Sequence, residues 1–148
     1  KFVKGSADSG VTNIRNVTSP HWRRWLGVEN RCVVPATSFS EYGSVRDPGT
    51  KKLPIFWFAL SESKPLFFMA GIWTSWNGVR KVKEGAQDHE IFGFLTCEPN
   101  SVVAPIHQKA MPVILRDKDE IETWLSAPSS EALTLQRPFP DDGLVVLK

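Results

Sequence analysis

Three apolar segments of strand length lie close together in the chain, and they constrain the fold more than any other feature. They are residues 53–60 (LPIFWFAL), 66–73 (LFFMAGIW) and 90–97 (EIFGFLTC), and they are rich in the aromatic and β-branched residues that favour strands. Polar loops connect them, which predicts hairpins rather than βαβ crossovers. The sequence therefore predicts an α+β fold around a mainly antiparallel curved sheet or a partly open β-barrel, with a few short helices.

The other elements follow from local signals. Ser19 followed by Pro20 predicts a helix start, because serine suits the N-cap and proline the first helical position. Asp117 with Glu120 resembles a capping box at the start of the clearest helix. The strands at 53–60 and 66–73 are apolar on both faces, so we expect them to be central and covered. We expect further strands at residues 31–36, 39–42, 111–115 and 143–148, helices at 20–26, 100–106, 117–126 and 129–135, and a loop over 1–12.

Composition excludes several classes of protein. A chain of 148 residues has room for one domain, so we expect a single domain over 1–148. No apolar run approaches the roughly 20 residues that span a membrane, and the first residues lack the apolar core of a signal peptide. Cys32 and Cys97 both lie in apolar runs and form no CxxC pair, which predicts neither a disulfide framework nor a zinc site. We expect no metal, no cofactor, and a reducing, cytoplasmic setting.

The charges are unevenly distributed along the chain. Residues 1–52 hold nine Lys/Arg and four Asp/Glu, a net charge of +5, whereas residues 53–148 hold nine and twelve, a net charge of −3. A basic first third favours an anionic ligand there. A mixed solvated surface explains the charges alone at least as well.

Two residues are candidates for acid–base chemistry, because each stands in an apolar setting that can move its pKa towards neutrality. Glu41 lies in TSFSEYG, and His107 lies between apolar segments in APIHQKAMPVIL. Taken singly, a solvent-facing glutamate and a packed loop histidine remain good alternatives. His21 and His89 lie in polar segments and are expected to be exposed.

A polar cluster precedes the first predicted helix. Asn13 and Arg15, with Asn16 and Thr18, suit phosphate binding, because arginine is a planar donor and a helix start offers free N–H groups. A hydrogen-bonded turn accounts for the same residues equally well.

A thiol nucleophile is a third possibility. Cys97 and His107 are ten residues apart and could form a nucleophile–base pair. The position of Cys97 within a predicted strand favours buried packing instead.

These clusters, in this order, resemble the SOS response-associated peptidase (SRAP) family. The chain has NIRNVT at 13–18, RCVVPATSFSEY at 31–42, FMAGIW at 68–73, and FLTCEPNSVVAPIHQKAMPVIL at 94–115, followed by Trp124-Leu125. The family patterns are N-A-R-x-E-T, a strand ending P-A-x-G-F-x-E-W, A-G-L-W, and T-x-x-A-N-x-x-V-x-x-I-H-x-x-M-P. Four ordered boxes covering most of the chain are far more specific than any one of them.

The resemblance implies a sensor of abasic sites in single-stranded DNA. In the family, an N-terminal cysteine condenses with the ring-opened sugar aldehyde to form a thiazolidine crosslink, and self-removal of preceding residues gives the peptidase name. Residue by residue, Asn13 matches the asparagine that holds the cysteine region and sugar. Arg15 matches the phosphate-binding arginine, Glu41 the catalytic glutamate and His107 the catalytic histidine.

The chain also departs from the family pattern. Family members begin Met-Cys-Gly-Arg, whereas this sequence begins at Lys1 and has no cysteine before Cys32. We therefore expect either an N-terminally truncated SRAP-like domain or a degenerate member, and the resemblance leaves open whether this chain is itself an enzyme. Tyr42 replaces the tryptophan after the glutamate and keeps an aromatic ring that can stack. Other substitutions are Ile14, Val17, Ser38 and Pro99, and Ala110 lengthens the segment between the histidine and Met-Pro.

Three hypotheses remain open at this point. The chain is the acid–base part of an abasic-site crosslinking protein, with DNA damage as its context. Alternatively, it is a non-covalent single-stranded DNA-binding module that uses Arg15, Arg23, Arg24 and Tyr42 for backbone and stacking contacts. The third hypothesis is a thiol peptidase that uses Cys97 and His107.

Overall fold

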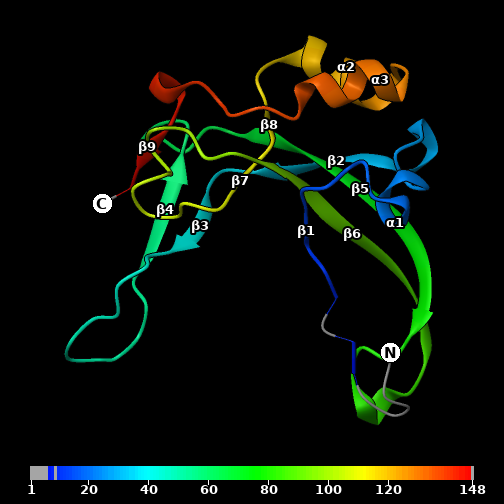
Figure 1. The fold of residues 1–148 in the computed structure, drawn as a ribbon, viewed down its shortest axis with the longest axis horizontal. Helices are drawn as coiled ribbons and strands as arrows, with labels where there is room; N and C mark the ends of the chain where they lie inside the picture. Colours follow the sequence, from blue (N-terminus) through cyan, green and yellow to red (C-terminus); the bar gives the residue numbers. More distant parts are fainter. Residues whose placement is uncertain (1–6, 9, 148) are drawn as a thin grey trace.

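A long curved hairpin forms the body of the molecule (Figure 1). The computed structural model describes residues 7–8 and 10–147. Strands β5 (Phe67–Gly78) and β6 (Gln87–Cys97) pair antiparallel over eight residue pairs, from Gly71↔Phe94 to Gly78↔Gln87. Strand β2 (Arg31–Ala36) pairs antiparallel with β5, and β1 (Asn13–Ile14) pairs parallel with β6. The path β1-β6-β5-β2 is therefore a mixed sheet that is mainly antiparallel.

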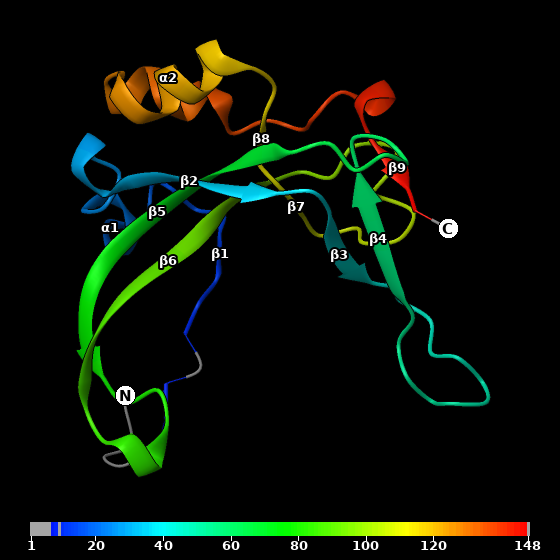
Figure 2. The same cartoon turned by 180° about the vertical axis from the view of Figure 1, so that it is seen from behind.

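A second, smaller sheet continues the curve. Its strands are β3 (Phe39–Tyr42), β4 (Ile55–Ala59) and β9 (Val145–Val146), all antiparallel. Between the sheets, β7 (Met111–Pro112) pairs with β6, and β8 (Ile114–Leu115) pairs with β5. The two sheets together form a curled half-barrel, which confirms the predicted fold class (Figure 2).

The helices are short and begin where the sequence predicts. Ser19 accepts a hydrogen bond from the His21 amide at the start of the first helix, and Asp117 accepts one from the Glu120 amide at the start of the longest. The helices are α1 (Pro20–Arg23), α2 (Lys118–Ser126) and α3 (Ser129–Ala132), with 3-10 turns η1 (Val28–Asn30), η2 (Val82–Glu84), η3 (Leu133–Leu135) and η4 (Asp141–Gly143).

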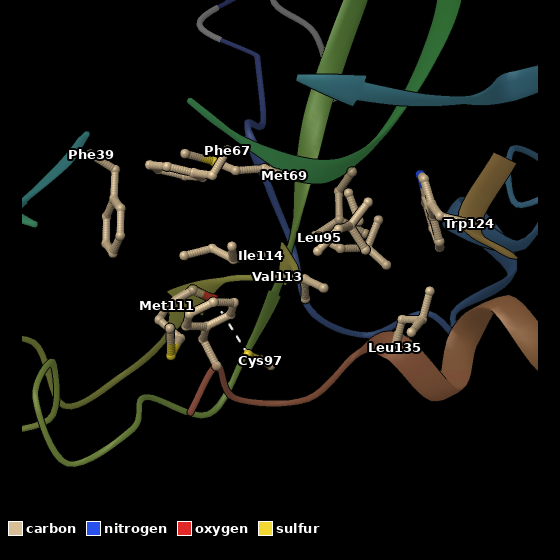
Figure 3. Packing of buried hydrophobic residues seen from close by; sticks show 14 of the residues in the cluster. Phe39, Phe67, Met69, Leu95, Cys97, Met111, Val113, Ile114, Trp124 and Leu135 are labelled. Carbon is tan, nitrogen blue, oxygen red and sulfur yellow. Dashed lines mark hydrogen bonds between the residues drawn. The ribbon is translucent and has the colours of Figure 1, made fainter. Parts of the chain in front are cut away.

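One continuous core joins the larger sheet, the smaller sheet, α2 and the C-terminal segment (Figure 3). Trp124 of α2 is fully buried, and its indole N–H donates to the Cys32 carbonyl at 2.8 Å, so one side chain joins the helix to the sheet edge. Leu95 and Val113 are also fully buried in this core. Burying one such large side chain stabilises the fold by about 1.5–3 kcal/mol.

One glycine lets β1 approach the sheet. A Cβ at Gly93 would lie 2.9 Å from Cδ1 of Ile14 and 3.1 Å from the Thr12 carbonyl oxygen, which is closer than real Cβ atoms normally come. That same carbonyl accepts a hydrogen bond from the Phe94 amide at 2.7 Å. The absence of a side chain at position 93 therefore allows the segment that carries Asn13 to lie against β6.

The structure differs from the sequence predictions at several elements. Strands β5 and β6 include polar residues predicted as loop, because Trp76 stacks on His89 across the ladder and Asn77 donates to Asp88. Residues 111–115 form two strands, since the chain passes from β6 to β5 at Val113, whose N–H donates to Leu95 and whose carbonyl accepts from Ala70. Residues 100–106 form hydrogen-bonded turns rather than a regular helix.

The prediction that the apolar strands are covered on both faces is wrong in part. Ile55 and Trp57 of β4 are 53% and 49% exposed, although Phe58 and Ala59 of the same strand are fully buried. Leu125 of α2 is also 37% exposed. Within the part of the chain that the structure describes, the face of β4 that carries Ile55 and Trp57 is therefore partly open to solvent.

No helix in the described part of the chain has both the length and the apolar character needed to span a bilayer.

A buried carboxylate joins α2 to the C-terminal segment and provides a test of this packing. Glu120 is 7% exposed; it accepts from the Arg116 amide and guanidinium and from the Arg137 guanidinium. Burial raises its pKa, but these hydrogen bonds outweigh burial and hold the pKa below its usual value. We predict that Glu120→Gln lowers the free energy of unfolding at pH 7 by roughly 1–3 kcal/mol.

The sign of the pH dependence follows from the lowered pKa. The contribution of Glu120 is present above the pKa of an unfolded glutamate and is lost as pH falls through the folded-state value, so parent and variant should converge in acid. Urea unfolding across pH checks this, with the exposed Glu122→Gln on the same helix as the control. Equal stabilities of parent and Glu120→Gln at pH 7 would contradict the interpretation.

Candidate acid–base site

A carboxylate and an imidazole from distant parts of the chain meet at the margin of the core. Oε2 of Glu41 lies 3.6 Å from Nδ1 of His107, although 66 positions separate the two residues. Their side chains are 24% and 30% exposed, respectively, so both are half-buried and open to solvent on one side. The structure thus brings together two of the residues that the sequence nominated for acid–base chemistry.

Strand alternation directs Glu41 towards the core side. Cross-strand partners in an antiparallel pair share a face of the sheet. The pairs Phe39↔Phe58 and Glu41↔Phe56 therefore lie on the same face, which is the one that packs against the core. Phe39 and Phe58 are buried and stack with ring centroids 5.1 Å apart. Glu41 is one step beyond this stacked pair, at the margin of the core, and the strand fixes its direction.

His107 is held by a folded loop over residues 98–110. Asn100 precedes the turns of this loop, is 7% exposed, and accepts a hydrogen bond from the Val103 amide through its side-chain oxygen. Val103 is fully buried, and its carbonyl accepts the His107 N–H at 2.9 Å. The turn that carries the imidazole is therefore anchored in the core rather than free on the surface.

Arg15 joins the two ends of this loop. Its Nη1 donates to the Cys97 carbonyl and to the Lys109 carbonyl, both at 2.9 Å, and its Nη2 pairs with Glu98 at 3.0 Å. Cys97 ends β6 and Lys109 comes two residues before β7, so one guanidinium closes the stem of the loop. In this structure Nη2 of Arg15 is thus paired with a carboxylate, and the phosphate role predicted for Arg15 stays a prediction.

Gln136 is a contributor that the sequence analysis missed. Its Nε2 donates to the Arg15 carbonyl at 2.8 Å and to the Thr96 carbonyl at 2.9 Å, at the place where the β1–β6 ladder ends. The same C-terminal segment accepts the Asn100 side-chain amide at the Phe139 carbonyl. In the sequence, Gln136 is marked only by its polar side chain in a segment that runs from the apolar Leu135 to the apolar Phe139. That signal does not indicate which strands its amide would bridge.

Burial determines the electrostatics of the pair. Partial burial raises the pKa of Glu41 above its usual value, and the neighbouring His107 partly opposes that shift. A carboxyl group with a raised pKa holds its proton closer to neutral pH than a surface glutamate does. Such a group beside an imidazole can both give and take protons at one reacting atom.

The other predicted site residues lie at different distances from this pair. Asn13 is exposed on β1, two residues before Arg15, and no hydrogen bond or ion pair joins it to Glu41 or His107 among the described residues. Tyr42 follows Glu41 and therefore points to the opposite face of β3, where it is 59% exposed. Tyr42 and Glu41 therefore lie on opposite faces of the sheet, and the stacking role of Tyr42 stays a prediction.

Arg23 and Arg24 lie at the other end of the sheet. They belong to the turn at α1, next to the start of β2, whereas β3 follows the end of β2 (Figures 1 and 2). The guanidinium of Arg24 stacks 4.0 Å over the Trp25 ring. With Trp22 and Trp25 it lines a cavity of about 560 Å³ between α1 and the β5–β6 hairpin, which neither Glu41 nor His107 lines.

The two cysteines behave as packing residues. Cys97 is 4% exposed, its Sγ donates to the Met111 carbonyl, and burial raises its pKa to about 11 (Figure 3). Burial also raises the pKa of the Cys32 thiol. Because the thiolate is the nucleophile, this environment disfavours the thiol peptidase hypothesis. Among residues 7–8 and 10–147, no group of three or more His, Cys, Asp or Glu side chains could hold a metal ion.

Comparisons with known proteins match most of the chain to one family. Residues 5–148 match the family model described as SOS response associated peptidase (SRAP). The chain is 34% identical over 128 residues to the abasic site processing protein YoqW of Bacillus subtilis, a match that covers 84% of this chain and 52% of the relative. The abasic site processing protein YobE of the same organism is also 34% identical over 128 residues, with 84% and 53% covered.

A solved structure gives the same result at the level of the fold. A crystal structure of a protein from Bacteroides thetaiotaomicron superimposes with a TM-score of 0.69 at 28% identity, covering 92% of this chain and 58% of that protein. The chain spans about half the length of the curated relatives it matches. On the family match across residues 5–148 and these relatives, the chain belongs to the SOS response-associated peptidase (SRAP) family.

Proposed function

We propose that this chain supplies the acid–base groups of a site that captures the ring-opened aldehyde of an abasic site in single-stranded DNA. The observation that carries the proposal is the contact of 3.6 Å between Glu41 and His107, two half-buried groups from separate segments. The names of the curated relatives, which are abasic site processing proteins, support the substrate class. Burying a carboxylate costs stability, which favours a chemical role for the pair over DNA binding alone.

The proposed chemistry moves two protons from nitrogen to oxygen at one carbon. An amine attacks the aldehyde carbon, and one member of the pair takes a proton from the nitrogen while the other gives one to the oxygen, which leaves a carbinolamine. In a second exchange the hydroxyl takes a proton from the pair and leaves as water, the nitrogen gives its remaining proton to the pair, and an imine remains. A neighbouring thiol then adds across the C=N bond, its sulfur to the carbon and its proton to the nitrogen, and closes a thiazolidine. Reversal uses the same groups in the opposite sense, and the self-cleaving peptidase activity of the family is proposed to use them as well.

The thiol of that last step is not found in a suitable place within the 148 residues. Thiazolidine formation needs an amine and a thiol on adjacent carbons, whereas Cys32 and Cys97 lie inside the chain with their nitrogens in peptide bonds. Imine formation, the step before the thiol adds, can be followed by itself, because borohydride reduction traps the imine as a covalent adduct.

The first prediction concerns the pair directly. Glu41→Gln and His107→Asn should each slow borohydride-trapped adduct formation with an abasic single strand by roughly 10²–10⁴-fold, the usual loss for a general acid or base. A denaturing gel gives the rate under saturating DNA. Glu62→Gln, an exposed carboxylate in a turn, is the control. Rates within twofold of the parent for both variants would rule out the proposal.

The second prediction concerns the pH dependence of stability. Because the folded-state pKa of Glu41 is raised, the folded protein binds its proton more tightly than the unfolded chain does. Ionised Glu41 therefore lowers stability above that pKa, and the penalty disappears as pH falls through it. Glu41→Gln should raise the denaturation midpoint at pH 8 and lose this advantage towards pH 4. An advantage that grows in acid would show that the pKa of Glu41 is not raised.

The third prediction tests the clamp on the loop. Arg15→Lys keeps the charge but cannot reach Cys97, Lys109 and Glu98 together through one planar group. Adduct formation under saturating DNA should fall by roughly ten- to a hundredfold, because a small displacement of a catalytic group has effects of that size. Arg80→Lys, at an exposed arginine that follows β5, is the matched control. An unchanged saturated rate would show that the loop holds its position without Arg15.

A further inference from the structure

The outer face of the β3–β4 hairpin exposes an unusual set of side chains. Tyr42 is 59% exposed, Ile55 53% and Trp57 49%, and the register Tyr42↔Ile55 and Ser40↔Trp57 puts all of them on one face. Large aromatic residues that gather on an open face indicate a binding surface more often than isolated ones do. We call Ser40, Tyr42, Ile55 and Trp57 the outer hairpin face.

Cationic residues border this face at its open end. Arg46 and Lys52 line a shallow groove of about 390 Å³ together with Tyr42, Leu53 and Ile55. The loop that carries them extends away from the body of the molecule (Figure 1). It contains Arg46, Lys51 and Lys52 against a single acid, Asp47, a net charge of +2.

The loop is ordered by its one acid, which leaves the cations to face outwards. The Asp47 carboxylate accepts hydrogen bonds from the Gly49 and Thr50 amides and from the Thr50 hydroxyl. Arg46 donates from Nη1 to the Lys51 carbonyl at 2.9 Å, which holds the guanidinium against the loop and leaves its other nitrogens without a protein partner among the described residues. A positive groove next to stacking rings complements a strand with a phosphate backbone and unpaired bases.

The geometry points to a second contact for single-stranded nucleic acid on the outer hairpin face, outside the acid–base site. This inference rests on the proposed function, because it assigns the surface to the same strand that carries the abasic site. Glu41 and Tyr42 are neighbours on β3 but point to opposite faces, and β3 is the edge strand of its sheet. A DNA strand whose reacting sugar lies at Glu41 can reach Tyr42 and Trp57 by passing around the β3 edge of the sheet.

A second contact on the outer hairpin face makes the affinity of the protein for single-stranded nucleic acid depend on the length of the oligonucleotide. An oligonucleotide of about 4 nucleotides fills the acid–base site alone, whereas one of about 12 nucleotides also covers the outer face, within the site sizes usual for single-strand binding folds. The rings supply stacking for any base, so we expect little sequence preference. The cations supply a dependence on salt.

The test measures anisotropy of labelled oligonucleotides that contain no abasic site. Trp57→Ala should weaken the binding of the longer strand about tenfold and leave that of the shorter strand unchanged, and Trp57→Phe should restore most of the affinity. Lys52→Glu should lower the affinity for the longer strand and flatten its salt dependence. The matched controls are Val82→Ala and Lys83→Glu, exposed residues in η2 between β5 and β6.

The outcomes separate this inference from the proposed function. Unchanged affinity of Trp57→Ala for the longer strand, with adduct formation still dependent on Glu41, would overturn the outer-face contact alone. Loss of self-association in Trp57→Ala without loss of DNA affinity would assign the face to protein contact and would also overturn it. Weaker binding by Trp57→Ala with adduct formation independent of Glu41 would support the contact and reject the proposed chemistry.

Discussion

The geometry of the candidate site depends on the guanidinium of Arg15. A loop of residues 98–110 carries His107, and loops of this length have many conformations unless their ends are fixed. Arg15 fixes both ends through one nitrogen, by donating to the Cys97 and Lys109 carbonyls. Gln136 in turn binds the Arg15 carbonyl and holds it against β6. The position of the imidazole is thus set by the edge of the sheet and by the C-terminal segment.

The fold fixes the direction of the Glu41 side chain and also shifts the pKa of its carboxyl group. Strand alternation in β3 places Glu41 beside the stacked rings of Phe39 and Phe58, and this margin of the core raises its pKa. A partly buried carboxylate lowers the stability of the folded state, and stabilising contacts elsewhere offset this loss. One of them is the cluster of Glu120 with Arg116 and Arg137, which joins α2 to the C-terminal segment. Stability and reactivity are in this way distributed over separate parts of the molecule.

Much of the fold could be predicted from the sequence, because strand-forming runs and helix caps are local signals. The strands predicted at 31–36 and 66–73 and the caps at Ser19 and Asp117 follow from such signals. The parallel pairing of β1 with β6 could not be predicted, because it joins residues 81 positions apart through a ladder of only two residues. The close approach of the two strands depends on Gly93, which has no side chain to block it.

The candidate site was predictable only in part. Glu41 and His107 could be nominated from their apolar neighbours and from the family boxes, whereas their contact is a product of the tertiary fold. The separation of Tyr42 from Glu41 follows from the two-residue period of a strand and was available from the sequence. The bridge made by Gln136 was not available, because a single polar residue in an irregular segment does not indicate its partners.

The most direct test of the central claim is a double-mutant cycle on Glu41 and His107, read out as the rate of borohydride-trapped adduct formation with an abasic single strand. If the two residues act as one acid–base unit, the double variant Glu41→Gln/His107→Asn should be about as slow as the slower single variant, because losing either partner disables the unit. Rate losses that multiply in the double variant would show that the two groups act independently and would contradict the account.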